Sequence, residues 1–343
     1  MTFLRICAAC FFVPAIGACS EARSWTRAEQ MSSRNLRPVH TYSIVARDKA
    51  TGDLGVAVQS HWFSVGPIVP WAEAGVGAVA TQSLVDPSYG PLGLQAMRLG
   101  KSAPGALRGL LAGDEGREVR QVAMIDSQGR VAAHTGTRCI AEAGHVVDED
   151  AQFSVQANLM ENDTVWPAMA EAYRAAKGDL AERLLAALEA AEREGGDIRG
   201  RQSAAIVVVR AKATGKPWED RVFDLRVEDH PAPVAELRRL VGLQRAYNHM
   251  NAGDLAIEKK DFAAAQREYE AAAKLAPEIV ELPFWHAVTL ANNGRLGEAL
   301  PIFRAVFAKE PKWAEVVPRL VKSELLPDDP EMVEKILAER DDD

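Results

Sequence analysis

Short runs of hydrophobic residues, separated by clusters of turn-forming residues, fill much of the first two thirds of the chain. The runs at 41–47 and 54–60 flank a turn that contains Gly52, which is the pattern of a β-hairpin. Runs of similar character predict further strands at 75–82, 121–126, 130–135, 153–158, 203–210 and 221–227. The chain is therefore expected to contain extensive β-sheet structure.

Amphipathic helical patterns lie between these clusters of strands. Apolar residues recur with helical spacing at 91–99, 103–112, 164–176 and 180–194. Each sheet must bury a face against another layer, so strands on both sides of a helical cluster predict sheets with helices packed outside them. The fold class expected for residues 40–241 is therefore α+β.

From about residue 246 the pattern changes to helices with an internal repeat. Five positions agree at a spacing of 34 residues. They are Gly253, Ala265, Tyr269, Ala272 and Pro277 in the first unit, and Ala287, Ala299, Phe303, Val306 and Pro311 in the second. Small residues at helix contacts, with Pro after the second helix, resemble the tetratricopeptide repeat. The prediction is an all-α repeat domain at 246–322 and a tail at 323–343.

The N-terminal residues differ from everything that follows. Arg5 precedes an apolar run at 6–16, which is typical of a secretory signal peptide and too short for a comfortable transmembrane helix. An aliphatic residue and two small residues precede Cys19, so the segment also resembles a bacterial lipobox, in which Cys19 is acylated. We predict a signal peptide and lipobox at 1–22 and a linker at 23–39. The alternatives are a plain cleaved signal and a segment without a targeting role.

Composition limits the kinds of binding partner and the cellular location that we expect for the protein. With 48% hydrophobic and 26% charged residues, the chain is an ordinary globular protein. Its net charge of −8 argues against nucleic acid or an anionic membrane surface as the main partner. Membrane contact is expected only through a lipid anchor on Cys19. The expected location is outside the cytoplasm, as a periplasmic or outer-membrane-anchored lipoprotein.

The cysteines and glycines predict no cofactor and no metal. Cys7, Cys10 and Cys19 lie in the leader, so Cys139 is alone in the folded part and has no partner for an intrachain disulfide. No ligand spacing suggests a zinc site. The glycines at 75–77 lack the rest of a phosphate-binding fingerprint, and no Gly-x-Ser-x-Gly motif is present.

Several stretches within residues 40–241 carry a more specific signal. They are 41–48 (TYSIVARD), 54–60 (LGVAVQS), 69–72 (VPWA), 75–82 (GVGAVATQ), 89–91 (YGP), 195–205 (GGDIRGRQSAA) and 224–231 (DLRVEDHP). Together they resemble the bacterial family called domain of unknown function 1028. The resemblance implies the fold of the N-terminal-nucleophile hydrolases, a four-layer αββα sandwich. It implies no particular reaction, because the activity of that family is not established.

Thr41 is the residue that such a fold would use for chemistry. In an N-terminal-nucleophile enzyme, the first residue of the first strand attacks an amide carbonyl, and its own α-amino group takes the proton. An α-amino group suits this role because its pKa is about 8. Thr41 opens the first predicted strand, but residues 1–40 precede it, so catalysis requires a cut between His40 and Thr41. The alternative is an ordinary β-branched strand residue.

Three further residues are candidates for the catalytic site. Asp197 and Ser203 belong to a dense polar run beside an apolar strand, and either is a candidate to orient the Thr41 amine. Asn158, at the end of its predicted strand, is a candidate oxyanion donor. We therefore expect these side chains to lie close to Thr41.

The same polar run supplies candidate substrate-binding residues. Arg199, Arg201 and Gln202 are placed to hold a substrate, because a guanidinium group binds a carboxylate through two parallel hydrogen bonds. The alternative is a structural network of Asp and Arg that closes the edge of the sheet. The residue types fit both interpretations.

Three functions follow from these patterns, the last of which is an interaction protein in which the repeats dominate. The first is an exported amidohydrolase or peptidase-like enzyme that acts on an unidentified small-molecule or peptide substrate. The second is a catalytically inactive scaffold of the same fold that binds a ligand or a protein. In any case the repeats are expected to bind a protein partner, since stacked repeats form a concave surface. A homo-oligomer is left open, and the substrate cannot be read from the residues.

We predict that Cys19 of the mature protein carries lipid. Substitution of Cys19 by Ala should abolish labelling by a palmitate analogue in the native host, because the thiol is the acylation site. Labelling that is unchanged in the Cys19→Ala variant would show that the lipobox interpretation is wrong.

Overall fold

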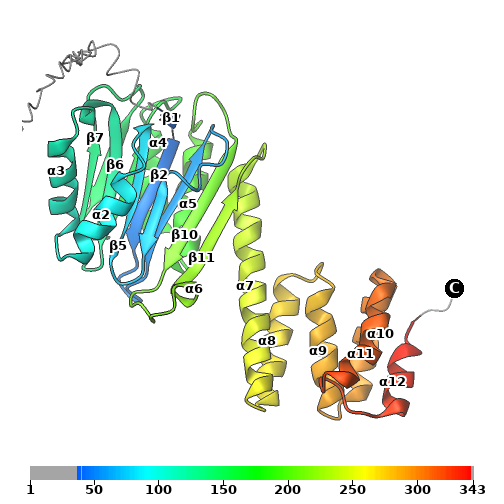
Figure 1. The fold of residues 1–343 in the computed structure, drawn as a ribbon. Helices are drawn as coiled ribbons and strands as arrows, with labels where there is room; N and C mark the ends of the chain where they lie inside the picture. Colours follow the sequence, from blue (N-terminus) through cyan, green and yellow to red (C-terminus); the bar gives the residue numbers. More distant parts are fainter. Residues whose placement is uncertain (1–36, 40, 341–343) are drawn as a thin grey trace, which may run out of the picture. The chain divides into compact units, whose positions relative to one another are not determined.

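The structure is a computed structural model that describes residues 37–39 and 41–340 (Figure 1). It contains two antiparallel sheets with helices packed on them, followed by a helical C-terminal region. The prediction of a mixed α and β fold that ends in helices is confirmed. The predicted signal peptide, Cys19 and nearly all of the linker at 23–39 lie outside the described residues.

One sheet has six strands, and the strand that begins at Thr41 lies within it. The order is β11 (Arg221–Val227), β10 (Ser203–Val209), β3 (Leu54–Ser60), β2 (Thr41–Arg47), β9 (Phe153–Ala157) and β8 (Gly144–Asp148). Neighbouring strands are antiparallel throughout. In the β2–β3 turn, the carboxylate of Asp48 accepts hydrogen bonds from the N–H groups of Ala50 and Thr51, and Gly52 adopts a φ of 82°. These local bonds explain why the hairpin has its predicted bounds.

The second sheet has five strands. The order is β1 (Arg37–Val39), β5 (Gly77–Val85), β6 (Arg120–Asp126) and β7 (Val131–Thr135), and β4 (Pro70–Glu73) also pairs with β5. Along β5, residues 77–80 pair with β4 and residues 83–85 pair with β1. The chain therefore runs from the five-stranded sheet, at β1, into the six-stranded sheet at Thr41.

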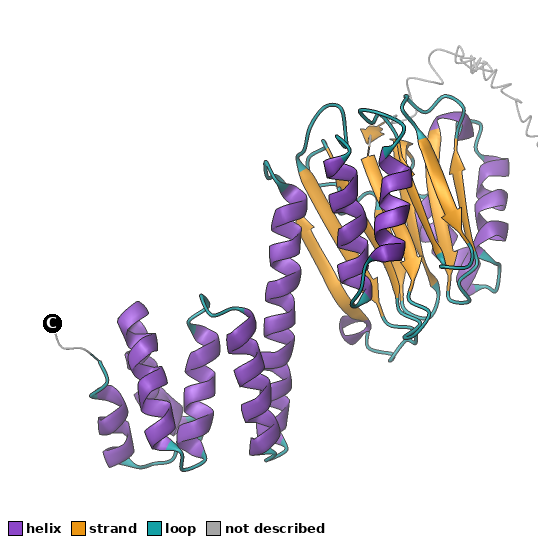
Figure 2. Ribbon diagram, turned by 180° about the vertical axis from the view of Figure 1, so that it is seen from behind, coloured by secondary structure: helices purple, strands orange, loops and turns teal. Residues whose placement is uncertain are grey.

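Helices cover the outer faces of the two sheets (Figures 1 and 2). The pair α2 (Tyr89–Arg98) and α3 (Ala103–Gly113) shares a core with β5 and β6. The pair α4 (Val165–Ala175) and α5 (Leu180–Arg193) shares a core with the six-stranded sheet. A third core, formed by residues of both sheets, fills the space between them. Two short elements complete this part of the chain, η1 (Arg117–Val119) and α6 (Pro217–Asp220).

Side chains along β2 alternate between these two cores. Tyr42 and Ile44 pack against α4 and α5, whereas Val45 packs between the sheets. Successive side chains of a strand point to opposite faces, so Thr41 and Ser43 share the face of Val45. The inward face of β2 is therefore apolar at Val45 and polar at the end where the strand begins.

Helix α7 (Pro233–Glu258) runs without a break for 26 residues and crosses the predicted boundary between 241 and 246. Its first half joins the core under the six-stranded sheet through residues such as Leu237. Arg238 forms ion pairs with Glu182 and Glu189 of α5. The second half packs on the next helix. The change in pattern near 246 therefore marks a change of neighbours rather than a loop.

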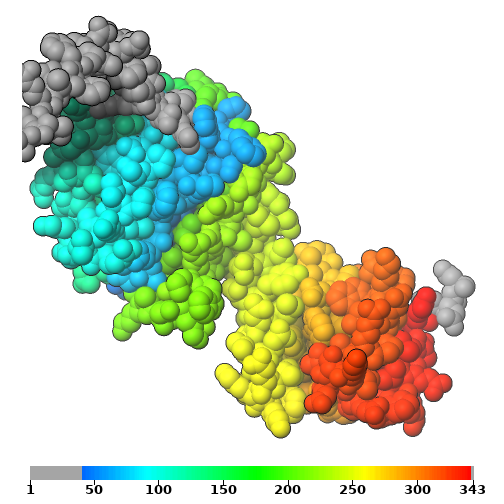
Figure 3. Space-filling view, viewed as in Figure 1, coloured from blue at the N-terminus to red at the C-terminus, as the bar shows by residue number. Residues whose placement is uncertain are grey.

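The remaining helices form one packed region (Figure 3). They are α8 (Phe262–Leu275), α9 (Glu281–Asn292), α10 (Leu296–Lys309), η2 (Pro311–Val316), α11 (Val317–Lys322) and α12 (Pro330–Leu337). The segment at 323–343, expected as a tail, contains α12. Ile336 of α12 is buried in the same core as Phe303 of α10. The segment is therefore part of the helical core as far as Ile336. Within the described residues, no helix is both long and apolar enough to cross a membrane.

Gly253 marks a close approach between α7 and α8. A Cβ atom placed on Gly253 would lie 2.7 Å from a ring carbon of Tyr269, which is itself buried. Gly242 lies in the same helix, and a Cβ placed there meets nothing within 4 Å. The close packing of α7 on α8 thus requires glycine at position 253, whereas position 242 has room for a side chain.

We expect opposite effects from adding one methyl group at each position. Gly253→Ala should lower the free energy of unfolding by about 1–3 kcal/mol, because the Tyr269 ring must move. Gly242→Ala should raise it by up to about 1 kcal/mol, because Ala favours the helix and nothing is displaced. Denaturant unfolding followed by circular dichroism measures both. Equal effects of the two substitutions would contradict the close packing at Gly253.

Candidate functional site

Thr41 lies at one end of the six-stranded sheet in a row of hydroxyl residues. On the neighbouring strand β3, Ser60 is directly opposite Thr41, and on β10 Ser203 is directly opposite Ser60. Residues that are directly opposite one another share a face of the sheet, so all three side chains belong to the face that meets the other sheet. All three residues are completely buried.

Both sheets hold the backbone of Thr41. Its carbonyl oxygen accepts a hydrogen bond from the backbone N–H of Asn158 at 3.1 Å and from Nε2 of Gln82 at 3.0 Å. Nδ2 of Asn158 lies 3.4 Å from the same oxygen. Gln82 belongs to β5 and Asn158 follows β9, so the two sheets meet at this carbonyl. The structure therefore brings together Thr41 and the predicted site residue Asn158.

Gln121 of β6 lies at the centre of the contacts around Thr41. Its Oε1 accepts from Nε2 of Gln82 at 2.7 Å and from Nδ2 of Asn158 at 2.8 Å. Its Nε2 donates to the carbonyl oxygen of Ala157 at 2.8 Å and to Oγ1 of Thr135 at 2.9 Å. Gln121 is completely buried, so these bonds replace those that its amide would make with water.

Further polar side chains extend these contacts along the gap between the sheets. Oγ of Ser43 donates to Oε1 of Gln82 at 2.6 Å, and Nε2 of Gln156 donates to Oγ of Ser43 at 2.5 Å. We call these residues the inter-sheet network, which comprises Thr41, Ser43, Gln82, Gln121, Gln156 and Asn158. Only Thr41 and Asn158 of this network are candidates from the sequence alone. A usable signal exists in β6, where Gln121 takes an inward position on the face of Ala123 and Ile125.

Two residues beside this network have strained backbones. Ser83 has a φ of 72° and Leu159 a φ of 58°, values that are uncommon for residues other than glycine. They directly follow Gln82 and Asn158, the two residues whose side chains contact the Thr41 carbonyl. Such conformations cost on the order of 1–3 kcal/mol each and gather at functional sites. Their position therefore supports a functional role for this end of the sheets.

Asp197 and Arg199 form a compact network at the same end of the six-stranded sheet. The nearly buried carboxylate of Asp197 accepts from Nε of Arg199 at 2.9 Å and from Nη2 of Arg199 at 2.6 Å. It also accepts from the backbone N–H of His61 at 3.2 Å, one residue after Ser60. The arrangement matches the structural alternative, in which Asp and Arg close the edge of the sheet.

The other predicted residues of the polar run bind neighbouring groups. Oγ of Ser203 donates to the carbonyl oxygen of Trp62 at 2.5 Å and accepts from the N–H of Val65 at 3.2 Å, so it holds the loop after β3. Nε2 of Gln202 donates to Asp229 at 3.1 Å. Nε of Arg201 lies 3.6 Å from Oε1 of Glu192. Burial raises the pKa of Glu192, and Arg201 opposes that shift.

A cavity of about 480 Å³ adjoins the inter-sheet network at Thr135. Oγ1 of Thr135 contacts both Gln121 and Nδ1 of His145, the latter at 2.8 Å. Burial, with a smaller effect of His134, lowers the pKa of His145, so its imidazole is neutral at pH 7. Burial raises the pKa of Cys139, which also lines the cavity, so its thiol stays protonated.

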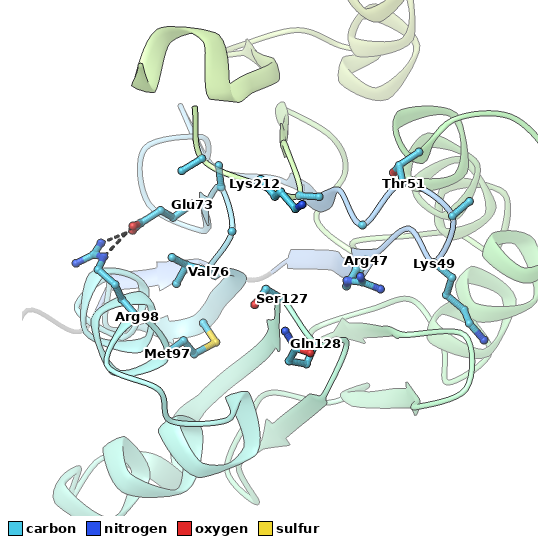
Figure 4. Close-up of a pocket in the computed structure, with 16 residues that line it drawn as sticks. Arg47, Lys49, Thr51, Glu73, Val76, Met97, Arg98, Ser127, Gln128 and Lys212 are labelled. Atoms are coloured by element: carbon cyan, nitrogen blue, oxygen red, sulfur yellow. Dashed lines mark hydrogen bonds and ion pairs between the residues drawn. The ribbon is translucent and has the colours of Figure 1, made fainter. Parts of the chain in front are cut away.

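The cavity in Figure 4 lies at the opposite end of β2 and has a volume of about 810 Å³. Arg47, the last residue of β2, lines it, about 20 Å along the strand from Thr41. Lys49, Arg98 and Lys212 also line it, and Glu73 is paired with Arg98 at 2.8 Å. The cavity is therefore basic, in a protein whose net charge is −8.

Comparisons with known proteins agree with this mixed fold of two antiparallel sheets and helices. The family model DUF1028, described as a family of unknown function, matches residues 41–237. The chain belongs to this family, and the match begins at Thr41. Among solved structures, SPO2555 from Silicibacter pomeroyi carries the same family model. It shares 31% sequence identity with this chain at a TM-score of 0.54, over 66% of this chain and 91% of that chain. None of the curated proteins matches the chain.

Proposed function

We propose that residues 40–241 form an N-terminal-nucleophile hydrolase fold of four layers, αββα, and that Thr41 is its nucleophile for amide bonds. The observation that carries the proposal is the position of Thr41. It opens an inner strand, faces the gap between the sheets, and is held at its carbonyl by Gln82 and Asn158. The two strained residues beside it and the start of the family match at residue 41 add support.

The proposed reaction needs a free α-amino group on Thr41. Hydrolysis of the peptide bond between residues 40 and 41 provides it. The amine then takes the proton of Thr41 Oγ1, the oxygen attacks the substrate carbonyl, and the protonated amine returns the proton to the leaving nitrogen. Water opens the resulting ester and restores the hydroxyl. Each turnover thus consumes one water and cleaves one C–N bond.

The residues around Thr41 have separate roles in this proposal. Asn158 uses its side-chain nitrogen to contact Gln121 and the Thr41 carbonyl, so we assign it to positioning the nucleophile rather than to the oxyanion. Asp197 and Ser203 hold the strand ends and the loop after β3. Arg201 has the longest contact of the three predicted binding residues, 3.6 Å, and is half exposed, so it is the best placed to turn towards a substrate.

Strand β1 indicates the kind of substrate that this site would accept. Its three residues lie just before position 40 and pair with Ser83–Val85 of β5 in extended conformation. The described residues before position 40 thus form a short edge strand, as do peptides that extend a sheet edge. This arrangement favours a peptide-like substrate over a compact small molecule.

The remaining expectations complete the proposal. The C-terminal helices act as two tetratricopeptide repeats with a protein partner, because the first four of the five repeated positions are buried in both units, whereas Pro277 and Pro311 are exposed. The chain is exported and anchored through Cys19, as its leader indicates. The anchor on Cys19 belongs to the chain before the cut, because a cut before Thr41 breaks the covalent link between Cys19 and residues 41–343.

Thr41 variants test the proposal directly. The mature wild-type chain should begin at Thr41, because only a cut before this residue frees the amine. Thr41→Ala should stay uncut and lose amidase activity by roughly a thousandfold or more, about 4 kcal/mol of transition-state stabilisation. Thr41→Ser should retain part of both properties. Intact-mass spectrometry and a panel of peptidyl amides measure these outcomes. An active protein whose chain is not cut before Thr41 would contradict the mechanism.

An inactive ligand-binding scaffold is the second candidate, and the basic cavity of Figure 4 favours it. Within the described part of the chain, the Lys212 ammonium has no hydrogen-bond or ion-pair partner. Arg47 points into the same hollow and is held by Oε1 of Gln152 at 2.8 Å. A ligand with two or more negative charges fits this pair of cations.

Pyrophosphate should raise the melting temperature of the wild-type protein if the cavity binds anions. Lys212→Glu should abolish this increase, because it replaces the unpaired cation by an anion. Lys101→Glu makes the same charge change at an exposed position outside the cavity and should leave the increase intact. Thermal unfolding with and without pyrophosphate gives the comparison. Equal losses in both variants would show that overall charge causes the increase in melting temperature, and that this cavity does not.

A further inference from the structure

The helical region contains a cavity of about 430 Å³ between α7, α8, α9 and the turn before α12. Its apolar lining comes from three separate elements, which are α7, α9 and the turn before α12. The apolar residues are Met250, Ile257, Trp285, Val288 and Leu325. Leu325 lines the cavity and is 39% exposed, so part of its apolar surface remains open to a ligand. The cavity therefore offers apolar area to a ligand that brings apolar side chains of its own.

Four carboxylates surround this apolar surface. They are Asp254, Glu258, Glu281 and Glu324. Asp254 accepts a hydrogen bond from the hydroxyl of Tyr269, and Glu281 accepts from the hydroxyl of Tyr247 at 3.2 Å. Both groups are thus held in place. None of the described residues that line the cavity is Lys or Arg.

Glu258 and Glu324 are exposed, and within the described residues no tyrosine hydroxyl holds them as it holds Asp254 and Glu281. In the described part of the chain, neither has an ion-pair partner. Charges at the edge of an apolar surface select a partner of opposite sign and repel one of like sign. An acidic peptide is therefore disfavoured here, and the net charge of −8 adds to that effect at low salt.

We propose that this cavity binds a peptide segment of another protein in which apolar side chains are interspersed with Lys or Arg. The apolar side chains enter between Trp285 and Leu325, and the basic groups pair with Glu258 and Glu324. This inference deepens the proposed partner-binding role of the helices, and it is independent of any reaction at Thr41. An interface of this kind combines an apolar centre with a charged rim.

Peptide binding to the full-length protein tests the proposal. Fluorescence anisotropy is measured with three labelled peptides of equal length: alternating Leu and Arg, alternating Leu and Glu, and alternating Ser and Arg. The peptide of alternating Leu and Arg should bind, and added salt should weaken its binding. The other two should bind at least roughly tenfold more weakly, because each lacks one of the two complementary properties. Equal binding of the Leu and Glu peptide, or no binding of the first, would overturn the proposal.

Surface variants locate the site without disturbing the core. The double variant Glu258→Lys with Glu324→Lys should weaken binding of the Leu and Arg peptide roughly tenfold, because two attractive pairs become repulsive. Leu325→Ser should weaken it several-fold. Glu334→Lys, an exposed position on α12 that does not line the cavity, is the matched control and should have little effect. An equal effect of the control would place the binding elsewhere.

Thr41→Ala separates this inference from the proposed hydrolysis. The variant should bind the Leu and Arg peptide with the affinity of the wild-type protein, because Thr41 and the cavity share no lining residue. Loss of peptide binding in Thr41→Ala would overturn the inference, whereas loss of amidase activity alone would bear only on the reaction.

Discussion

The bonds that cross the gap between the two sheets are the interactions on which the geometry of Thr41 depends. Gln82 and Gln121 come from one sheet, Ser43 and Asn158 come from the other, and their bonds join in a buried network. An unpaired buried amide costs roughly 1–3 kcal/mol, so the sheets cannot slide past one another without a large penalty. The apolar side chains elsewhere in the gap do not fix the position of one sheet relative to the other, because hydrophobic contacts are not directional.

The sequence predicts the strands and helices well where the signals are local. The β2–β3 hairpin has the expected bounds because its two hydrophobic runs and the turn residues between them all lie within twenty residues of one another. The short strands β1, β4 and β8 escape such reasoning. Each has only three to five residues, which is too short for a clear period, and β1 depends in addition on the distant strand β5 as its partner. The unbroken course of α7 escapes it as well, because the repeat begins within a helix that also packs under the six-stranded sheet.

The candidate site residues also differ in whether a local sequence signal points to them. Thr41 and Asn158 attract notice because they stand at strand ends, and the structure brings them together. Gln82 carries no local signal, and Gln121 carries only its position on the apolar face of β6, since the partners of both belong to another strand or another sheet. The run from Asp197 to Ser203 is dense in polar residues, yet Asp197 binds Arg199 two positions away and Ser203 binds the loop after β3. A dense run of polar residues therefore indicates a well-ordered strand end and does not by itself indicate a catalytic site.

The character of the network also constrains any chemistry at Thr41. Its described side chains are hydroxyls and amides, which carry no charge. An α-amino group freed in such surroundings would be poorly solvated, and burial lowers the pKa of an amine. The neutral form, which is the form that accepts a proton, would then dominate at neutral pH. Thr41 is itself completely buried, so the reaction proposed for it would also require the site to open.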